Sequence, residues 1–455
     1  LHTAYRRQRQ MCIRDRYHVF YQTNPYNGFW DCMHWGHAVS KDLVHWEYLP
    51  LALAPSEEYD DYQKGGCFSG SAIEHEGKLY VFYTATANHG NGSEQSQCLA
   101  ISEDGINFEK YDGNPLFDAP EGIQPDSFRD PKVWKHENKY YMVVGASRNN
   151  RGLALIYESA DLYHWNFLNV LAESRGEWGF MWECPDFYQL GDKYVLTFSP
   201  MGSGDHTSVY LTGDFDYKTG KFDWHISGEM DWGFDFYAPQ SMVAPDGRRL
   251  IVAWANEWEW MPLFKDWGPT YQEGWCGFFN VIREVRMCKD GTLAFVPVEE
   301  MEKIRENKFT QREIQITETP QQLKAGDGIS FEMKFTLDLE ETDADRVELK
   351  LRCGKEKESR CIFDLKNGEL LVDRSCADGW SVGTSRSVLK VSEKSLDVHI
   401  FSDQSSLEIF TDQYRNNHSN NIFAGNDQDA ISISAFGGRA VIRDYEAYGL
   451  QECFN

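Results

Sequence analysis

The sequence predicts an all-β protein with two domains. A five-bladed β-propeller is expected over residues 17–296 and a C-terminal β-sandwich over residues 313–455, with a linker at 297–312 between them. Three observations lead to this prediction. A strand-like motif returns at intervals of about 50 to 60 residues, a second motif stays in phase with it, and strict period-two alternation begins where both motifs end.

The first motif is a short run rich in Tyr, Val and Phe that a polar or Gly turn introduces. Its copies begin at Tyr17, Tyr80, Tyr141, Tyr194 and Leu250, so the steps between them are 63, 61, 53 and 56 residues. The second motif places an aromatic residue four positions after an Asp turn, as in segments 40–46, 102–108 and 159–165. Five such repeats with few helical patterns are typical of propeller blades. A generic all-β sandwich with Trp-rich turns is the alternative, but it would not keep two motifs in phase.

The pattern changes near residue 297. Residues 297–304 resemble a short polar helix, and beyond them apolar and polar residues alternate along segments separated by Asn-Gly and Asp-Gly turns. The alternating segments are 329–339, 347–351, 395–401, 406–410 and 430–435. This pattern predicts a β-sandwich without a clustered ionisable set, so we expect it to be structural or to offer a partner surface.

Composition narrows the possible function classes. The chain has 455 residues, with 45 Lys and Arg against 71 Asp and Glu, and its net charge of -26 disfavours nucleic acid as a partner. No apolar run of about 18 residues is present, so no membrane partner is expected. The 11 Cys lack a Cys-x-x-Cys pair, which favours reduced thiols and a cytoplasmic location. His34 and His37 are spaced like a metal pair but have no third ligand nearby, so we expect no metal and no cofactor.

Chemistry in a propeller is expected at the central channel, because the innermost strand of each blade lines it. Counting back 11 residues from the Tyr that begins the second, third and fourth motif copies gives Ser69, Asp130 and Glu183. Two carboxylates in one layer are the minimum that a glycosidase needs. Taken singly, an Asp-Pro pair is more often a turn and a Glu after Trp is more often a solvated strand end, so the shared spacing carries the interpretation.

Six motifs then follow one another along the propeller. They are Phe20-Tyr21-Gln22-x-Asn24-Pro25, Met33-His34-Trp35-Gly36-His37-Ala38, Phe68-Ser69-Gly70-Ser71, Phe128-Arg129-Asp130-Pro131, Trp182-Glu183-Cys184-Pro185-Asp186 and Phe236-Tyr237-Ala238-Pro239-Gln240-Ser241. With these motifs the chain resembles glycoside hydrolase family 32, the family of invertases, sucrose-6-phosphate hydrolases and levanases. The resemblance resumes at residues 400–410, and it implies a five-bladed propeller with a C-terminal β-sandwich.

The resemblance also implies roles for individual residues. Asp130 matches the transition-state stabiliser and Glu183 matches the general acid/base, with Arg129 and Cys184 positioned to tune its proton affinity. A retaining mechanism through a covalent fructosyl-enzyme is implied, with no cofactor. The sugar-binding shell is expected to contain Gln22, Trp30, Phe68, Ser69, Arg129, Tyr237 and Trp254, with Trp275 as a further member.

One motif of the family is missing from the printed sequence. The family's nucleophile is an Asp in Trp-Met-Asn-Asp-Pro-Asn-Gly on the innermost strand of blade one, and the same spacing of 11 leads here to Arg6. Residues 1–16 contain five Arg and match no blade strand, so we interpret them as a foreign segment. We expect the printed chain to lack the attacking carboxylate, because neither Asp15 nor Asp31 is at the required position.

The expected activity is hydrolysis of terminal β-fructofuranosyl bonds with retention, in sucrose, sucrose 6-phosphate or fructans. The partner would be a small-molecule or oligosaccharide fructoside. Two other interpretations stay open, a fructoside-binding propeller without catalysis and another five-bladed glycosidase that acts on arabinan or xylan. The choice among the three fructosides and the oligomeric state also stay open at this point.

Overall fold

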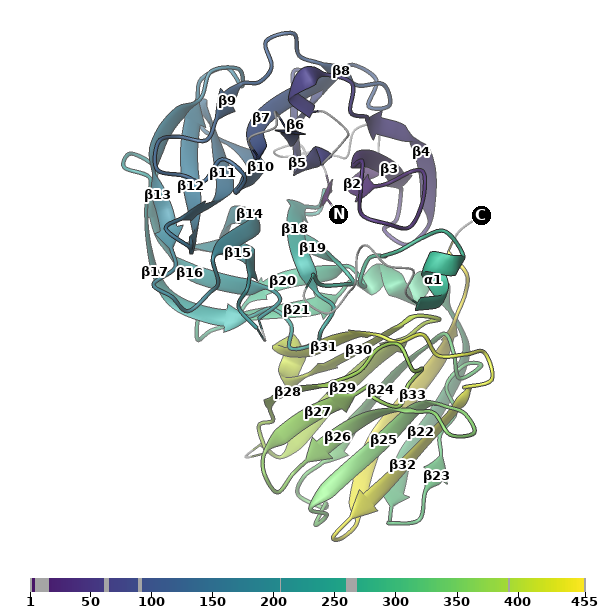
Figure 1. Cartoon of the computed structure of the whole chain (residues 1–455). Helices are drawn as coiled ribbons and strands as arrows, with labels where there is room; N and C mark the ends of the chain where they lie inside the picture. Colours follow the sequence, from purple (N-terminus) through teal and green to yellow (C-terminus); the bar gives the residue numbers. More distant parts are fainter. Residues whose placement is uncertain are drawn as a thin grey trace.

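A computed structural model describes residues 2–4, 16–60, 65–88, 92–204, 206–258, 268–391 and 393–453. Within these residues the regular secondary structure is almost entirely β-strand. Five small sheets surround a centre, and two six-stranded sheets lie below them in Figure 1. The prediction of a five-bladed propeller followed by a β-sandwich is confirmed.

Each blade is an antiparallel sheet whose strands follow one another in sequence order, except that the last strand of blade 2 pairs with the third strand of that blade. Blade 1 contains β1 (His2–Ala4), β2 (Tyr17–Thr23), β3 (His34–Ser40) and β4 (Trp46–Leu53), and blade 2 contains β5 (Gly66–His75), β6 (Lys78–Asn88), β7 (Ser93–Ser102), β8 (Glu109–Lys110) and β9 (Phe117–Asp118). Blade 3 contains β10 (Phe128–His136), β11 (Lys139–Arg148), β12 (Arg151–Ser159) and β13 (Asn166–Glu173). Blade 4 contains β14 (Met181–Leu190), β15 (Lys193–Met201), β16 (Val209–Asp216) and β17 (Lys221–Glu229). Blade 5 contains β18 (Tyr237–Val243), β19 (Arg249–Trp254), β20 (Arg283–Met287) and β21 (Leu293–Pro297).

The Asp turn with its aromatic partner closes the outer part of a blade. The Leu43 N–H donates to Ser40 Oγ (2.9 Å) and the His45 N–H donates to Asp42 Oδ1 (2.9 Å), which fixes the turn. Leu43 has a left-handed φ of 70°, and Trp46 Nε1 donates to its carbonyl at 3.1 Å. The segment 159–165 repeats all three bonds. In these two copies the four-residue spacing therefore follows from an indole that satisfies the carbonyl of the turn, whereas segment 102–108 has Phe108 at this position.

The innermost strand of blade 1 corrects one expectation about the N-terminal segment. β1 pairs antiparallel with β2 and contacts both β5 and β18, so it closes the ring of inner strands. The expectation that residues 1–16 match no blade strand is wrong for residues 2–4. Arg6 and Asp15 lie outside the described residues, and Asp31 is exposed in the loop between β2 and β3.

The sandwich begins earlier than predicted. One sheet has the order β22 (Arg305–Ile316), β33 (Ala440–Leu450), β24 (Phe331–Asp338), β29 (Ser395–Ser402), β30 (Ser406–Thr411) and β31 (Asn416–Asn421). The other has the order β23 (Gln321–Gln322), β32 (Ala430–Phe436), β25 (Arg346–Cys353), β26 (Ser359–Asp364), β27 (Glu369–Asp373) and β28 (Thr384–Val388). The stretch 297–312, predicted to be a linker, instead holds a 3-10 turn at Glu299–Ile304 and the first part of β22.

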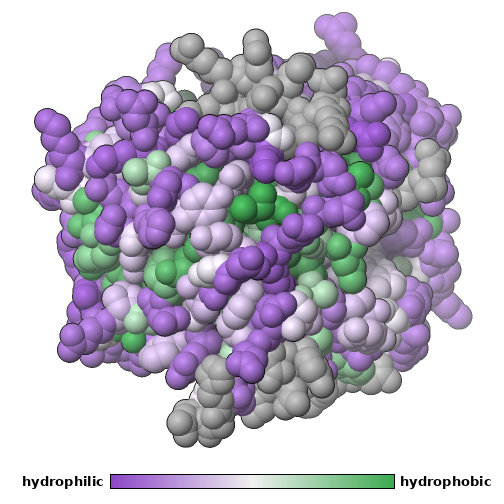
Figure 2. All heavy atoms as spheres, turned by 90° about the horizontal axis from the view of Figure 1, so that it is seen from above, coloured by the Kyte–Doolittle hydropathy of each residue, from purple (hydrophilic) through white to green (hydrophobic). Residues whose placement is uncertain are grey.

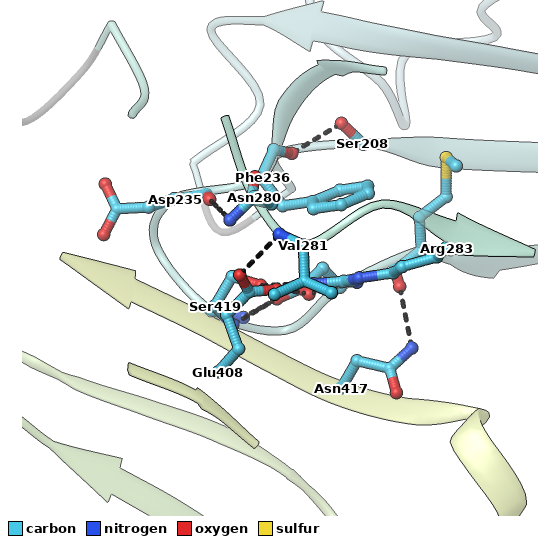
Figure 3. Close-up of polar contacts among 12 residues, drawn as sticks. Ser208, Asp235, Phe236, Asn280, Val281, Arg283, Glu408, Asn417 and Ser419 are labelled. Atoms are coloured by element: carbon cyan, nitrogen blue, oxygen red, sulfur yellow. Dashed lines mark hydrogen bonds and ion pairs between the residues drawn. The ribbon is translucent and has the colours of Figure 1, made fainter. Parts of the chain in front are cut away.

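The two domains are joined through buried ion pairs. Arg283 of β20 is fully buried, and it donates to Asp231 Oδ2 (2.8 Å) in the propeller and to Glu408 Oε2 (2.7 Å) in the sandwich. Figure 3 shows the Arg283 side chain beside Glu408 and Ser419 of the sandwich. The expectation that the sandwich holds no clustered ionisable set is wrong for another part of this domain, where Glu332 of β24 pairs with Arg305, Lys334 and His399.

The surface agrees with the composition. Figure 2 shows a face that is mostly hydrophilic, with hydrophobic groups in small separate patches. Among the described residues, no helix has the length and hydrophobicity that crossing a bilayer requires.

We predict an acid-sensitive stability from His418 of β31. Its ring nitrogens lie 2.8 and 2.7 Å from the hydroxyls of Ser385 and Ser387, and burial lowers its pKa from 6.5 to about 4, while Asp231 acts in the opposite direction. The unfolded chain gains this proton first as pH falls, so the free energy of unfolding should drop by about 3 kcal/mol between pH 6.5 and 4.

Thermal unfolding of the native chain and of His418→Gln over this pH range measures the effect. The melting temperature of the variant should depend less on pH than that of the native chain. Identical slopes for the two proteins would contradict the prediction.

Candidate active site

The inner strands share one irregularity that shapes the channel. In blades 2 to 5 the inner strand carries an extra residue relative to its neighbour, between Cys67 and Gly70, Arg129 and Lys132, Glu183 and Asp186, and Tyr237 and Gln240. In blades 3, 4 and 5 a residue inside this bulge has a left-handed φ, namely 68° for Asp130, 48° for Cys184 and 53° for Ala238. A bulge of this kind bends a strand and re-aims its side chains.

The bulges give a different alignment of blades from the spacing of 11. They make Arg129, Glu183 and Tyr237 equivalent, so Asp130 is equivalent to Cys184 and not to Glu183. The predicted alignment of blade 3 is therefore wrong by one residue. The spacing of 11 was counted from Tyr141, whereas the adjacent Tyr140 is the equivalent of Tyr194. Ser69 is two residues beyond the equivalent of Glu183, since the β5–β6 hairpin is longer.

Glu183 is the point at which the equivalent side chains meet. Arg129 Nε donates to its Oε1 at 2.8 Å, and Tyr237 OH donates to its Oε2 at 2.5 Å. The indole N–H of Trp258 donates to the same Oε2 at 2.9 Å. Glu183 is 9% exposed, so these donors compensate the burial of its charge while the carboxyl still reaches the channel.

Asp130 lies beside this cluster and is buried as well. Its Oδ2 accepts the Cys184 N–H at 2.8 Å and the Cys184 thiol at 3.4 Å, while its own N–H donates to Thr84 Oγ1 at 2.9 Å. Burial raises the pKa of Asp130, and the negative charge of Glu183 raises it further, while the Arg129 guanidinium acts in the opposite direction. Burial also raises the pKa of the Cys184 thiol, which stays a neutral donor.

A glycine in blade 3 explains why a carboxylate takes the Cys184 N–H. In blade 4, Ser199 pairs opposite Glu183 and its Oγ accepts the N–H of Ala238 at 2.8 Å. The equivalent residue in blade 3 is Gly145, which pairs opposite Arg129 and has no side chain to accept. A Cβ there would lie 2.0 Å from the Trp182 carbonyl oxygen, so the position has no room for a hydroxyl.

The predicted sugar-binding residues fall into two groups. Arg129, Tyr237 and Trp254 lie around Glu183, where the Trp254 and Trp258 rings have centroids 4.8 Å apart. The second group comes from blades 1 and 2. Gln22 donates to Ser69, and the Trp30 and Phe68 rings meet edge to face at 5.9 Å.

Trp275 and His37, also singled out in the sequence, lie in different surroundings. Trp275, the further member of the predicted shell, is 40% exposed and donates to Glu273 Oε2 at 3.0 Å. His37 is buried against the Phe20 ring at 4.3 Å and bonds His18 at 3.0 Å. The described residues contain no group of three or more His, Cys, Asp or Glu side chains that could hold a metal ion.

Trp258 was missed by the sequence analysis. It lies four residues after Trp254, in a Trp-rich segment outside every motif that was considered. The dense run of tryptophans after the last strand motif was the available signal, although nothing in the sequence shows which of them reaches Glu183.

Comparisons with known proteins cover both domains. Residues 8–297 match the family model described as glycosyl hydrolases family 32 N-terminal domain, and residues 300–449 match the model described as glycosyl hydrolases family 32 C terminal. The first match includes residues 8–16, part of the segment interpreted above as foreign.

Similar proteins match along most of the chain. Sucrose-6-phosphate hydrolase of Escherichia coli is 35% identical over 454 residues, which covers 95% of this chain and 89% of the relative. Raffinose invertase of Escherichia coli is 36% identical, with 94% and 89% covered. Among solved structures, the GH32 beta-fructofuranosidase of Bombyx mori has a TM-score of 0.81 at 31% identity, with 97% of this chain and 90% of that chain covered. The sucrose-6-phosphate hydrolase of Lactobacillus gasseri has a TM-score of 0.84 at 27% identity, with 96% and 89% covered.

The close approach at Gly145 gives a prediction about the scaffold of the site. Gly145→Ala should destabilise the chain by roughly 2 kcal/mol or more, because the new Cβ meets rigid backbone beside Glu183. Gly449→Ala is the matched control, since its Cβ would lie 3.3 Å from the flexible Glu306 side chain and 3.4 Å from Gly326 Cα, both much farther than the 2.0 Å approach at Gly145. Thermal unfolding compares the variants, and equal melting temperatures would contradict the steric argument.

Proposed function

Because the chain belongs to glycosyl hydrolase family 32 and is a fructosidase, like the relatives named above, we propose that Glu183 is its general acid/base and Asp130 its transition-state stabiliser. The observation that carries this assignment is the convergence of three donors on Glu183, next to a second buried carboxylate. Paired carboxyls with different surroundings are what glycoside hydrolysis requires.

Glu183 would transfer the proton in both halves of the reaction. Its protonated carboxyl would donate to the glycosidic oxygen as the bond to the fructosyl carbon breaks, and its carboxylate would then accept a proton from the attacking water. Arg129 holds Oε1, whereas Tyr237 and Trp258 hold Oε2, so the carboxyl has a fixed orientation towards the leaving group. A fixed donor is worth more to catalysis than a mobile one.

Asp130 would bind the fructosyl hydroxyls. Both Cys184 bonds go to Oδ2, so Oδ1 is the oxygen that we assign to the sugar. The aromatic residues of the two groups, among them Trp30, Phe68 and Trp254, would pack against the C–H faces of the substrate. This arrangement binds a fructosyl unit with one carboxylate and leaves the other free for proton transfer.

We propose small fructosides of the sucrose type as substrates. The relatives are named for sucrose 6-phosphate and for raffinose, and a mutant of the Bombyx mori enzyme has been solved in complex with sucrose. The cytoplasmic location expected from the cysteines stays a prediction.

The attacking carboxylate leads to the first prediction about activity. Replacing residues 1–16 by a strand with the Trp-Met-Asn-Asp-Pro-Asn-Gly motif, with its nucleophilic aspartate at position 6, should raise fructose release from sucrose by about 10³-fold or more. Sucrose affinity, measured by calorimetry, should change little, because the binding residues of blades 2 to 5 are untouched.

The other outcomes separate the alternatives. Comparable turnover by the unaltered chain would show that the nucleophile assignment is wrong, and Asp15, Asp31 or an inverting mechanism would then have to be considered. Sucrose binding without turnover in both versions would favour a fructoside-binding propeller. Sugar release from arabinosides or xylosides alone would favour another five-bladed glycosidase.

The acid/base assignment gives a second prediction about activity. In whichever version turns over faster, Glu183→Gln should lower kcat by about 10³-fold and leave KM nearly unchanged, since the amide keeps the shape but cannot donate the proton. Glu173→Gln is the control, because this carboxylate pairs with Arg148 at 2.6 Å on an outer strand. Steady-state kinetics on sucrose measure both variants, and a similar loss in the two would contradict the assignment.

A further inference from the structure

The sandwich meets the propeller through a strand made only of polar residues. β31 has the sequence Asn-Asn-His-Ser-Asn-Asn, it forms one end of its sheet, and all six residues are buried. The propeller loop 230–236 lies along this strand, with the Trp232 N–H donating to the Asn417 carbonyl (2.7 Å) and the Asp235 N–H to the Ser419 carbonyl (3.0 Å). The loop thus covers an edge that would otherwise expose unpaired backbone groups.

A glycine and a carboxylate hold the loop close to β31. A Cβ on Gly233 would lie 2.1 Å from the Ser419 carbonyl oxygen, so only glycine allows this approach. Ser419 donates to Asp231 through both its N–H (2.7 Å) and its hydroxyl (2.8 Å). Figure 3 shows Ser419 and Glu408 of the sandwich facing Arg283 and Val281 of the propeller. The interface therefore has one defined register.

The last residue of β31 reaches a different part of the propeller. Asn421 Nδ2 donates to the Ala255 carbonyl (2.6 Å) and to Asn256 Oδ1 (2.8 Å). Its backbone N–H donates to Asp235 Oδ2 at 2.6 Å, and Arg374 Nη1 donates to the same carboxylate oxygen at 2.6 Å. One sandwich side chain thus fixes the segment that follows β19.

The same segment contacts Glu183, the proposed acid/base residue. Trp258 comes two residues after Asn256, and its indole N–H donates to Glu183 Oε2. The other donor to this oxygen, Tyr237, directly follows the loop 230–236 that β31 holds. Both donors to Oε2 therefore lie on segments that the sandwich anchors, and Asn421 is the side chain that holds the segment of Trp258.

We propose that Asn421 is a positioning residue for the fructosidase reaction, which acts through the Ala255–Trp258 segment to hold the Trp258 indole against Glu183. The proposal rests on the acid/base role of Glu183 given above. Its amide donates two hydrogens in one plane to two acceptors on the same segment, so it restrains both position and orientation. An apolar side chain would leave the buried Ala255 carbonyl without this partner.

The test uses the full chain and a readout that does not need turnover. Protein labelled with 5-fluorotryptophan gives a ¹⁹F resonance for Trp258, identified by its absence from Trp258→Phe. In Asn421→Ala this resonance should shift or broaden by more than its linewidth. In the control Asn417→Ala it should stay in place, because Asn417 lies on the same strand but bonds Met230 and Tyr414 instead. An unmoved resonance in Asn421→Ala would overturn the proposal.

A kinetic readout connects the position of the indole to catalysis. In the version that turns over faster, Asn421→Ala should lower kcat about tenfold and leave KM nearly unchanged. It should also move the alkaline limb of the pH–rate profile, whereas the control Asn417→Ala should not move that limb. A displaced indole with unchanged kcat and pH profile would overturn the proposal. Failure of every version to release fructose would count against the proposed function, whereas the ¹⁹F comparison would still decide the positioning.

Folding is checked in each variant by thermal unfolding. If Asn421→Ala does not unfold cooperatively, Asn421→Asp replaces it, because the carboxylate keeps the shape of the side chain and removes both donated hydrogens. The same shift of the Trp258 resonance is expected, and its absence there would equally overturn the proposal.

Discussion

The burial of two carboxylates side by side in the channel is the constraint on which the rest of the structure depends. An isolated buried carboxylate is strongly unfavourable, so each must be surrounded by donors in fixed places. Glu183 receives a guanidinium, a phenol and an indole, and Asp130 receives a backbone N–H and a thiol. The five-bladed ring supplies these donors because it brings strands from distant parts of the sequence to one point.

The same requirement extends to the contact between the domains. β31 could have met the propeller through apolar residues, yet it is polar throughout and carries charge-assisted bonds through Arg283 and Arg374. Buried polar contacts are directional, so they specify one relative position of the two domains, whereas apolar surfaces tolerate sliding. A single register matters here because the loop and the segment held by this strand lead directly to Tyr237 and Trp258.

Much of this architecture follows from the sequence, and the failures have physical causes. The propeller and its turns were predictable because the Ser40–Trp46 turn and its repeats use local bonds that leave a fixed spacing. Glu183 and Asp130 were found from spacing, but their alignment was wrong because the bulge is invisible in the sequence and Tyr140 adjoins another tyrosine. Trp258 and Asn421 could not be predicted, since their roles arise from contacts between segments that no local pattern connects.

The bulge alignment also shows how one scaffold yields distinct chemical roles. Arg129, Glu183 and Tyr237 occupy the same backbone position in three successive blades, and equivalent positions converge on the channel because the inner strands form a ring. A cation, an acid and a phenol at these positions therefore contact one another without any change in the backbone. The next residue varies in the same way, from Asp130 to Cys184, and the carboxylate of one blade accepts the N–H and thiol of the next. Pseudo-symmetry thus fixes where the side chains meet, and the differences between blades determine what they do.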